Sequence, residues 1–187
     1  MEKIISLFKR NYETDHMVRD DVVPGAEWVL AGDGIATRKF DGTCCAIIGG
    51  ELWKRYDAKR GKMPPDGWIA AQEPDPITGH HPGWLKVKYE PDSVYHLEAF
   101  TKGVDSDGKP LRDGTYELCG PKMQGNPEGF TNHVLVRHGE EVLPTCPRDF
   151  DGIKDFLETA GIEGIVWHHP DGRMVKIKRK DFFKQAK

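Results

Sequence analysis

Residues 163–178 have the sequence EGIVWHHPDGRMVKIK, which determines much of the expected fold. Two strand-like runs, Ile162–His168 and Arg173–Lys178, flank the turn-forming residues Pro170-Asp171-Gly172. Apolar and β-branched runs on either side of a Pro-Asp-Gly turn are typical of a β-hairpin. The sequence therefore predicts two antiparallel strands at this point of the chain.

The polar residues of this hairpin follow the alternation of a strand. If the turn contains an even number of residues, Glu163 lies opposite an even-numbered residue and shares a face with Lys176 and Lys178. Val175 and Ile177 then point to the opposite face, which suits a core. Taken alone, the two lysines are more typical of the polar face of an edge strand.

Other elements can be placed outward from the hairpin. The clearest helix is Gly152–Ala160, which Asp149 or Asp151 can cap and Gly161 can end. The remaining expectations are a hairpin of Thr43–Ile48 and Glu51–Tyr56 across Gly49-Gly50, strands at Val94–Phe100 and Thr115–Cys119, a short helix within Met1–Tyr12, and an ordered loop region over Pro64–Pro91.

The composition is that of a soluble globular protein, with 37% hydrophobic and 30% charged residues among 187. We expect one domain over residues 1–187, with residues 1–30 leading into it. No run approaches the ~18 apolar residues of a membrane helix, and the N-terminus lacks a secretory cleavage site. These features predict a cytoplasmic protein without membrane contact.

The net charge of −3 excludes a generic binder of polyanions, but the charge is unevenly distributed. Residues 173–187 contain seven basic residues and one acidic residue, a local net charge of +6. Such a segment is either a solvated tail or a surface that faces phosphates.

The four cysteines have no spacing typical of zinc ligands. Cys44 and Cys45 are adjacent and would point to opposite faces of a strand. Reduced, buried thiols are the expected state.

The candidate chemistry begins at Lys39-Phe40-Asp41-Gly42, which follows the strand-like run Gly34–Arg38. A lysine must be neutral to attack phosphorus, and neighbouring cations and partial desolvation favour the neutral amine. Downstream, Lys176 and Lys178 would supply those cations and hold a triphosphate. Glu117 and Glu163 offer hard oxygen atoms for magnesium or a ribose.

Four short motifs occur in a defined order along the chain: KxDG, ELxG, EGxV and KxK, starting at residues 39, 117, 163 and 176. This order resembles the covalent nucleotidyltransferase superfamily, which comprises polynucleotide ligases and mRNA capping enzymes. Longer segments between Ala36 and Phe182 resemble the 5′-to-3′ RNA ligases first recognised in vertebrates, which are longer proteins: KFDGTCC (39–45), LWKRYD (52–57), GHHPGW (79–84), GNPEGF (125–130), RHG (137–139) and EGIVWHHPDG (163–172).

The resemblance implies an α+β fold, the nucleotidyltransferase or ligase adenylation domain. Two antiparallel sheets would enclose a nucleotide cleft, with few flanking helices and no oligonucleotide-binding barrel. It also implies ATP and Mg²⁺, with Mn²⁺ as a substitute, and RNA with 5′-phosphate and 3′-hydroxyl ends. The protein would act as a monomer through a lysyl-AMP and an adenylated RNA 5′ end.

The resemblance also implies roles for individual residues. Lys39 is the expected nucleophile, and Lys176 is expected to touch the α-phosphate. Glu163 and Glu117 are the expected metal ligands, and Glu117 is also a candidate ribose contact. The other expected nucleotide-binding residues are Arg38, Asp41, Gly42, Arg55 and Lys178.

Arg55 is a candidate substitute for an arginine that many superfamily members have at another position. They have an arginine two residues after the glycine of KxDG, where this chain has Cys44. If Gly49-Gly50 is a two-residue turn, Arg55 lies opposite Cys44 and can take over that contact.

Three alternatives stay open at this point. A capping-type guanylyltransferase or a DNA ligase would use the same lysine. A module that binds RNA or a nucleotide without catalysis would keep the fold and lose the chemistry.

Overall fold

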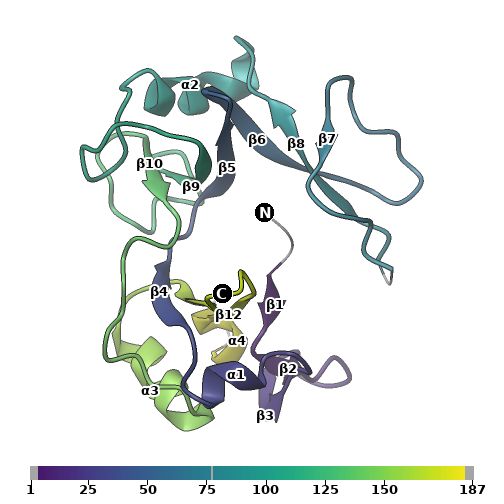
Figure 1. Ribbon diagram of the computed structural model, residues 1–187, viewed down its shortest axis with the longest axis vertical. Coiled ribbons are helices and arrows are strands. Elements are labelled where there is room, and N and C mark those ends of the chain that lie inside the picture. The colour runs from purple at the N-terminus through teal and green to yellow at the C-terminus, as the bar shows by residue number, and fades with distance from the viewer. Residues whose placement is uncertain (1–3, 77, 184–187) are drawn as a thin grey trace. The chain divides into compact units, whose positions relative to one another are not determined.

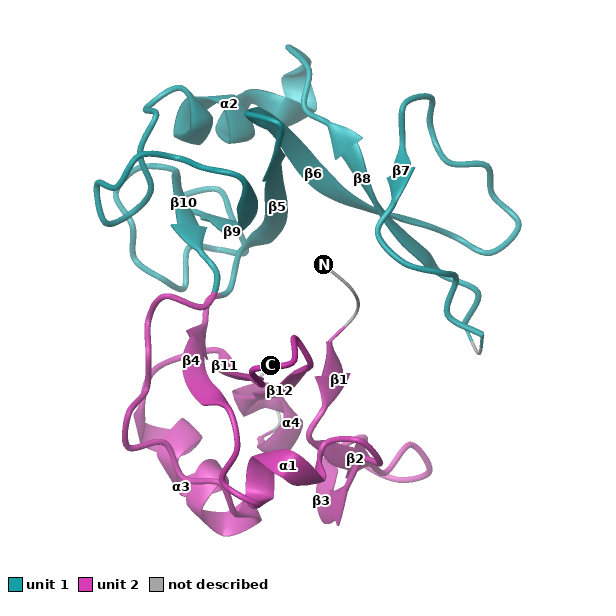
Figure 2. Ribbon diagram, viewed as in Figure 1, with its two compact units in different colours: residues 1–3, 41–138 teal, residues 4–40, 139–187 magenta. Residues whose placement is uncertain are grey.

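The computed structural model describes residues 4–76 and 78–183. The chain divides into two compact units, shown in Figures 1 and 2. Residues 4–40 and 139–187 form one, here called the Lys39 unit, and residues 41–138 form the other, the Glu117 unit. The chain therefore crosses between units after Phe40 and again after His138. The single ligase domain expected over residues 1–187 stays a prediction.

The Lys39 unit contains a four-stranded sheet in the order β1-β12-β11-β4. These strands are β1 (Ile5–Ser6), β12 (Met174–Lys178), β11 (Gly164–His168) and β4 (Ile35–Lys39). β1 pairs parallel to β12, and the other pairs are antiparallel. The unit also contains the paired strands β2 (Phe8–Arg10) and β3 (Val18–Val22) and the helices α1 (Glu27–Leu30), α3 (Phe150–Thr159) and α4 (Arg179–Phe182).

The core of the Lys39 unit lies on one face of this sheet. Trp167, Val175 and Ile177 are fully buried there, and α3 covers them with Ile153 and Leu157. The Asp149 carboxylate accepts a hydrogen bond of 2.8 Å from Gly152 N and caps the helix. The helix predicted over residues 152–160, with its cap, is thus confirmed.

The Glu117 unit contains a six-stranded antiparallel sheet in the order β10-β9-β5-β6-β8-β7. Its strands and helices are β5 (Thr43–Ile48), β6 (Glu51–Ala58), β7 (Ile69–Ala70), β8 (His81–Lys86), β9 (Gly114–Cys119), β10 (Val134–Arg137), the 3₁₀ turn η1 (Pro91–Ser93) and α2 (Val94–Phe100). Cys45, Tyr116, Leu118 and Leu135 form the core on one face of the sheet. The expected α+β class with antiparallel sheets and few helices is confirmed for the described residues.

The hairpin predicted at Gly49-Gly50 is also confirmed. Both glycines have positive φ angles, 59° and 75°, which two-residue hairpin turns of this type require. Their backbone N–H groups donate to the carboxylate of Asp113 at 2.7 and 2.9 Å. The paired register runs from Ile48 opposite Glu51 to Cys45 opposite Lys54.

The register predicted for the second hairpin is wrong. Gly164 pairs with Lys178 and His168 with Met174, so an odd number of residues, 169–173, connects the strands. Glu163 lies just before β11, and its backbone carbonyl accepts from Arg179 N at 2.7 Å. Because Glu163 lies outside the strand, the alternation of side chains between the two faces of a strand does not determine where its side chain points.

Two other predicted elements have the wrong type. Val94–Phe100 forms helix α2 rather than a strand, since the turn at Pro91–Ser93 leads into it and His96 and Ala99 bury one helical face. The helix expected within Met1–Tyr12 is replaced by β1 and β2; residues 1–3 lie outside the described residues. The edge of β12 binds this segment, with Leu7 N donating to Lys176 O at 2.8 Å.

The region 64–91 was expected to form a loop, but it contributes β7 and β8 to the sheet. Strand β8 contains Pro82 and Gly83, residues that argue against a strand in sequence. Gly83 provides space for a ring, because a Cβ there would lie 2.1 Å from Cε2 of Trp68. Packing against Trp68 therefore stabilises a strand at a place where Pro82 and Gly83 disfavour one.

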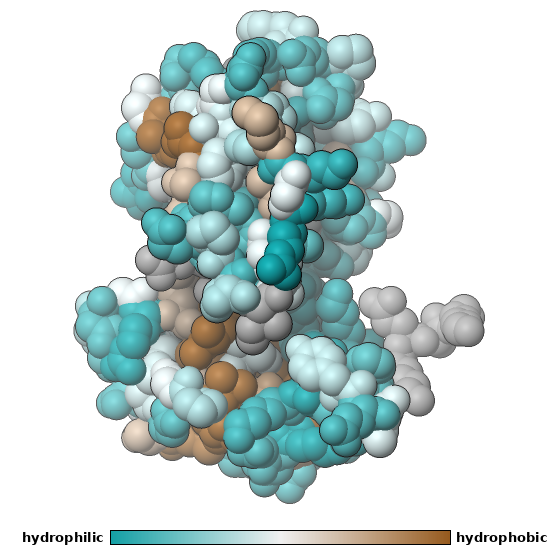
Figure 3. Space-filling view, turned by 90° about the vertical axis from the view of Figure 1, so that its right-hand side faces the viewer, coloured by the Kyte–Doolittle hydropathy of each residue, from teal (hydrophilic) through white to brown (hydrophobic). Residues whose placement is uncertain are grey.

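Hydrophilic residues cover most of the face drawn in Figure 3, with small hydrophobic patches among them. Within the described residues, no helix combines the length and the apolar character needed to cross a membrane.

Candidate active site

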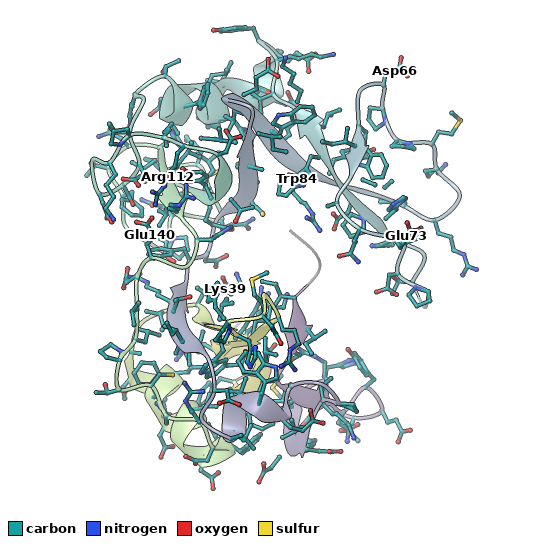
Figure 4. The ribbon with its side chains drawn as sticks, in the orientation of Figure 1. Lys39, Asp66, Glu73, Trp84, Arg112 and Glu140 are labelled. Carbon is teal, nitrogen blue, oxygen red and sulfur yellow. The ribbon has the colours of Figure 1, made fainter. Side chains whose placement is uncertain are left out.

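The lysine cluster consists of Lys39, Lys176, Lys178 and Glu163, all in the Lys39 unit. Lys39 ends β4, where Figure 4 labels it, and pairs with Gly164, which pairs in turn with Lys178. Paired residues of adjacent strands share a face, so Lys39 and Lys178 lie on the same side of the sheet. Lys176, two residues earlier in β12, lies on that side too.

Gly164 allows the strands to meet at this point. A Cβ on Gly164 would lie 2.2 Å from the carbonyl oxygen of Ile177. The residue between Lys39 and Lys178 in the sheet therefore has no side chain to separate them.

Glu163 bridges two of the lysines. Its Oε1 atom lies 2.7 Å from Nζ of Lys178, and its Oε2 atom accepts from Nζ of Lys39. The Glu163 side chain is only 10% exposed. Burial raises the pKa of this carboxyl, but the charge of Lys39 and the hydrogen bonds from both lysines outweigh burial, and the pKa lies below its ordinary value.

Lys176 is the cation of this cluster that stays available to a ligand. Burial, followed by repulsion from Lys178 and Lys39, lowers its pKa to about 8. None of residues 4–76 and 78–183 forms an ion pair with it. A partly buried cation without a counter-ion favours an added anion such as a phosphate.

Arg38 is not brought to the lysine cluster. It pairs with Ile165 on the core face of the sheet, one residue out of phase with Lys39. Its guanidinium lies over the ring of Phe40 at 4.4 Å and 3.3 Å from the carboxylate of Glu141. Its expected nucleotide contact stays a prediction.

Asp41 and Gly42 lie at the start of the Glu117 unit, and two carboxylates hold this segment. Asp41 N donates to Glu128 Oε1 at 2.8 Å, and Gly42 N donates to Glu117 Oε1 at 3.2 Å. A Cβ on Gly42 would lie 2.2 Å from the carbonyl oxygen of Leu118, so only glycine fits this approach. The expected contact of Gly42 with a nucleotide stays a prediction.

Glu117 belongs to a separate group in the Glu117 unit, with His138 and Cys44. Its Oε2 atom lies 2.8 Å from Nε2 of His138, and it pairs with Cys44 across β5 and β9. The structure therefore assigns the two expected metal ligands to two groups, Glu163 to the lysine cluster and Glu117 to its own unit.

Arg55 lies on β6, within the register that a two-residue turn predicts. Its Nε atom lies 2.9 Å from Asp57, and its guanidinium lies over the ring of Trp84 at 5.2 Å. The paired positions of β5 and β6 end one residue short of Cys44 and Arg55. Its expected contact with a nucleotide stays a prediction.

Two residues of these groups were not assigned from sequence. Glu128 holds the segment after the lysine, and the only available signal was its place in the GNPEGF segment. His138 lies in the RHG segment, and its contact with Glu117 could not be inferred from their spacing.

The comparisons with known proteins agree in finding similarity to one family. The family described as RNA ligase 1 matches residues 103–184, which include Glu117, Glu163, Lys176 and Lys178 but not Lys39. Proteins named RNA ligase 1 from Danio rerio, Pongo abelii and Rattus norvegicus are 29%, 27% and 28% identical to this chain.

These alignments cover 86%, 78% and 79% of this chain and 70%, 66% and 66% of the three relatives. The chain therefore spans about two thirds of their length. The chain is similar to the RNA ligase 1 proteins, and the comparisons support an RNA ligase family for it.

Proposed function

We propose that this chain is an ATP-dependent RNA ligase that joins a 5′-phosphate to a 3′-hydroxyl through AMP carried on Lys39. The relatives named RNA ligase 1 support the RNA ligase function. The observation that carries the lysine chemistry is the cluster itself. Lys39, Lys176 and Lys178 share one face, and Glu163 lies between two of them. Lys176 has no counter-ion within the part of the chain that the structure describes.

The proposed reaction begins with loss of a proton from the Lys39 ammonium to solvent. The neutral amine attacks the α-phosphorus of ATP, a P–N bond forms, and the bond to the leaving pyrophosphate breaks. Lys176 and Lys178 offset the negative charge on the phosphate oxygens. A binding phosphate also competes with Glu163 for Lys178, which loosens the pair that holds Lys39.

The later steps reuse the same cations. An oxygen of the RNA 5′-phosphate attacks the AMP phosphorus, the P–N bond breaks, and Lys39 recovers its proton from solvent. The 3′-hydroxyl then attacks the activated 5′-phosphorus, a phosphodiester forms, its proton passes to solvent, and AMP leaves. The protein contributes orientation and charge stabilisation in each step.

Magnesium fits this proposal through Glu163. Its carboxylate is a hard oxygen donor among amines, and magnesium commonly uses one or two protein carboxylates together with phosphate and water. When bound, the ion supplies charge neutralisation at the triphosphate. Manganese is expected to substitute for it.

Labelling with α-³²P-ATP and magnesium tests the proposal. We expect a covalent label on the unaltered protein and on the control Lys154→Ala, whose residue is exposed on α3 of the same unit. Lys39→Ala should carry no label. Absence of label on the unaltered protein would favour a non-catalytic binding module, and label from GTP alone would favour a capping enzyme.

Strand joining separates RNA from DNA ligation. Matched 5′-phosphorylated RNA and DNA should be offered in nicked, hairpin and single-stranded forms. We expect joining of RNA ends, and joining that requires DNA would contradict the proposal. RNA affinity should fall with added salt if the basic C-terminal segment contacts phosphates.

A further inference from the structure

Three strands of the Glu117 unit bring three different metal-binding side chains to one face. Cys44 on β5 pairs with Glu117 on β9, and Glu117 pairs with Val136 on β10. His138 follows β10 directly, and its Nε2 atom lies 2.8 Å from Oε2 of Glu117, so it reaches the same side. The opposite side carries Cys45, which is fully buried in the core of the unit.

The three ligand atoms are close enough to share one ion. One atom each from Cys44, Glu117 and His138 can be chosen so that all lie within 4.8 Å of one another. A tetrahedral ion with bonds of about 2.0–2.3 Å holds its ligand atoms about 3.3–3.8 Å apart. The side chains therefore need to move only slightly from their observed positions for the three atoms to coordinate one ion.

A bound ion would replace the hydrogen bond that links Glu117 Oε2 to Nε2 of His138. Glu117 Oε1 accepts from Gly42 N, so Oε2 is the oxygen that faces His138. Within residues 4–76 and 78–183, no group shares a hydrogen bond with the buried Nδ1 atom of His138.

The partial exposure of this group suits a metal site in which three protein ligands leave one coordination position open. Glu117 is 8% exposed, while Cys44 and His138 are partly exposed. Solvent therefore reaches the group from the side of the cysteine and histidine, where a water or substrate oxygen can complete the coordination.

We propose that Cys44, Glu117 and His138 bind one zinc-like divalent cation. Sulfur and imidazole ligands favour zinc and similar ions, whereas magnesium prefers oxygen ligands alone. Binding converts the Cys44 thiol to a thiolate, with its proton released to solvent. This group belongs to the Glu117 unit, and its binding of zinc can be measured without adenylation of Lys39.

Binding of zinc alone tests the proposal without any activity measurement. The full chain is freed of metal with a chelator, and zinc is then titrated against a chromophoric competitor. We expect one zinc ion per chain. Cys44→Ser and His138→Gln should each reduce the affinity for zinc by more than the factor of about 10 to 100 that is typical of changes around a metal site. Cys146→Ser and His169→Gln, from the other unit, should leave affinity unchanged.

Cobalt gives an independent signal. Co²⁺ bound to this site should show a sulfur-to-metal charge-transfer band that is absent in Cys44→Ser. Circular dichroism of the metal-free variants checks that they are folded; if one is not, the other variant and the cobalt spectrum still decide. Zinc binding that ignores both substitutions, or no binding above that of the competitor, would overturn the proposal while leaving labelling of Lys39 untouched.

Discussion

Oε1 of Glu163 lies 2.7 Å from Nζ of Lys178, on the same carboxylate that accepts from Lys39. One anion therefore holds two ammonium groups on a face that also carries Lys176. Removing the anion takes away the carboxylate that Lys39 and Lys178 share, beside the third cation Lys176.

Glu163→Gln should destabilise the protein in a pH-dependent way. The folded pKa of Glu163 is lowered, so its stabilisation is complete above the pKa of the unfolded chain and is lost as pH falls through the folded pKa. At pH 7 the unfolding free energy should fall on the order of 2 kcal/mol. Urea unfolding at pH 7 and near pH 3 checks this; an equal difference between the two proteins at both pH values would contradict it.

Lys176→Met should stabilise the fold while weakening adenylation. The pKa of Lys176 is lowered to about 8, so the unfolded chain binds more protons and the stability of the unaltered protein rises with pH from about 8 towards the ordinary lysine value. Methionine removes the buried charge and should add on the order of 1–3 kcal/mol at pH 7. That gain should shrink above pH 8.

Melting temperatures across this pH range test the charge of Lys176, with the exposed Lys154→Met as control. A gain that is the same at pH 7 and pH 10 would point to packing rather than charge. When the same two variants are labelled with ATP, Lys176→Met should carry less adenylate than the unaltered protein, and Lys154→Met should carry as much.

Gly42→Ala should cost more than a glycine substitution in open space. A Cβ at Gly42 meets the Leu118 carbonyl at 2.2 Å, whereas Gly161 has a positive φ but no atom within 4 Å of a Cβ. We expect a loss of about 2–3 kcal/mol for Gly42→Ala and about 1 kcal/mol for Gly161→Ala. Urea midpoints compare them, and the reverse order would show that the segment after Lys39 shifts freely.

The fold could be predicted where the signals were local. Gly49-Gly50 predicted a hairpin, and Asp149 predicted a helix start, because each acts on residues within a few positions. The strand β1 could not be predicted, since it depends on the distant edge of β12. Strand β8 could not either, because the reason for Gly83 is the ring of Trp68.

In the candidate site, too, the residues that belong to sequence motifs could be named in advance, whereas contacts between distant strands could not. Four of the residues that the motifs name, Lys39, Glu163, Lys176 and Lys178, lie in one unit, whereas Glu117 lies in the other. The register used for Glu163 was wrong, and its contact arises from a position outside the strand. Cys44 and His138 gave no metal signal in sequence, because only the pairing of three strands brings them to Glu117.

The most direct measurement is the location of the nucleotide on the protein. After incubation with ATP and magnesium, peptide mass spectrometry should find one AMP joined to the side chain of Lys39. Addition of 5′-phosphorylated RNA should then remove it. AMP on any other residue, or no covalent AMP while RNA ends are still joined, would contradict the proposed role of Lys39.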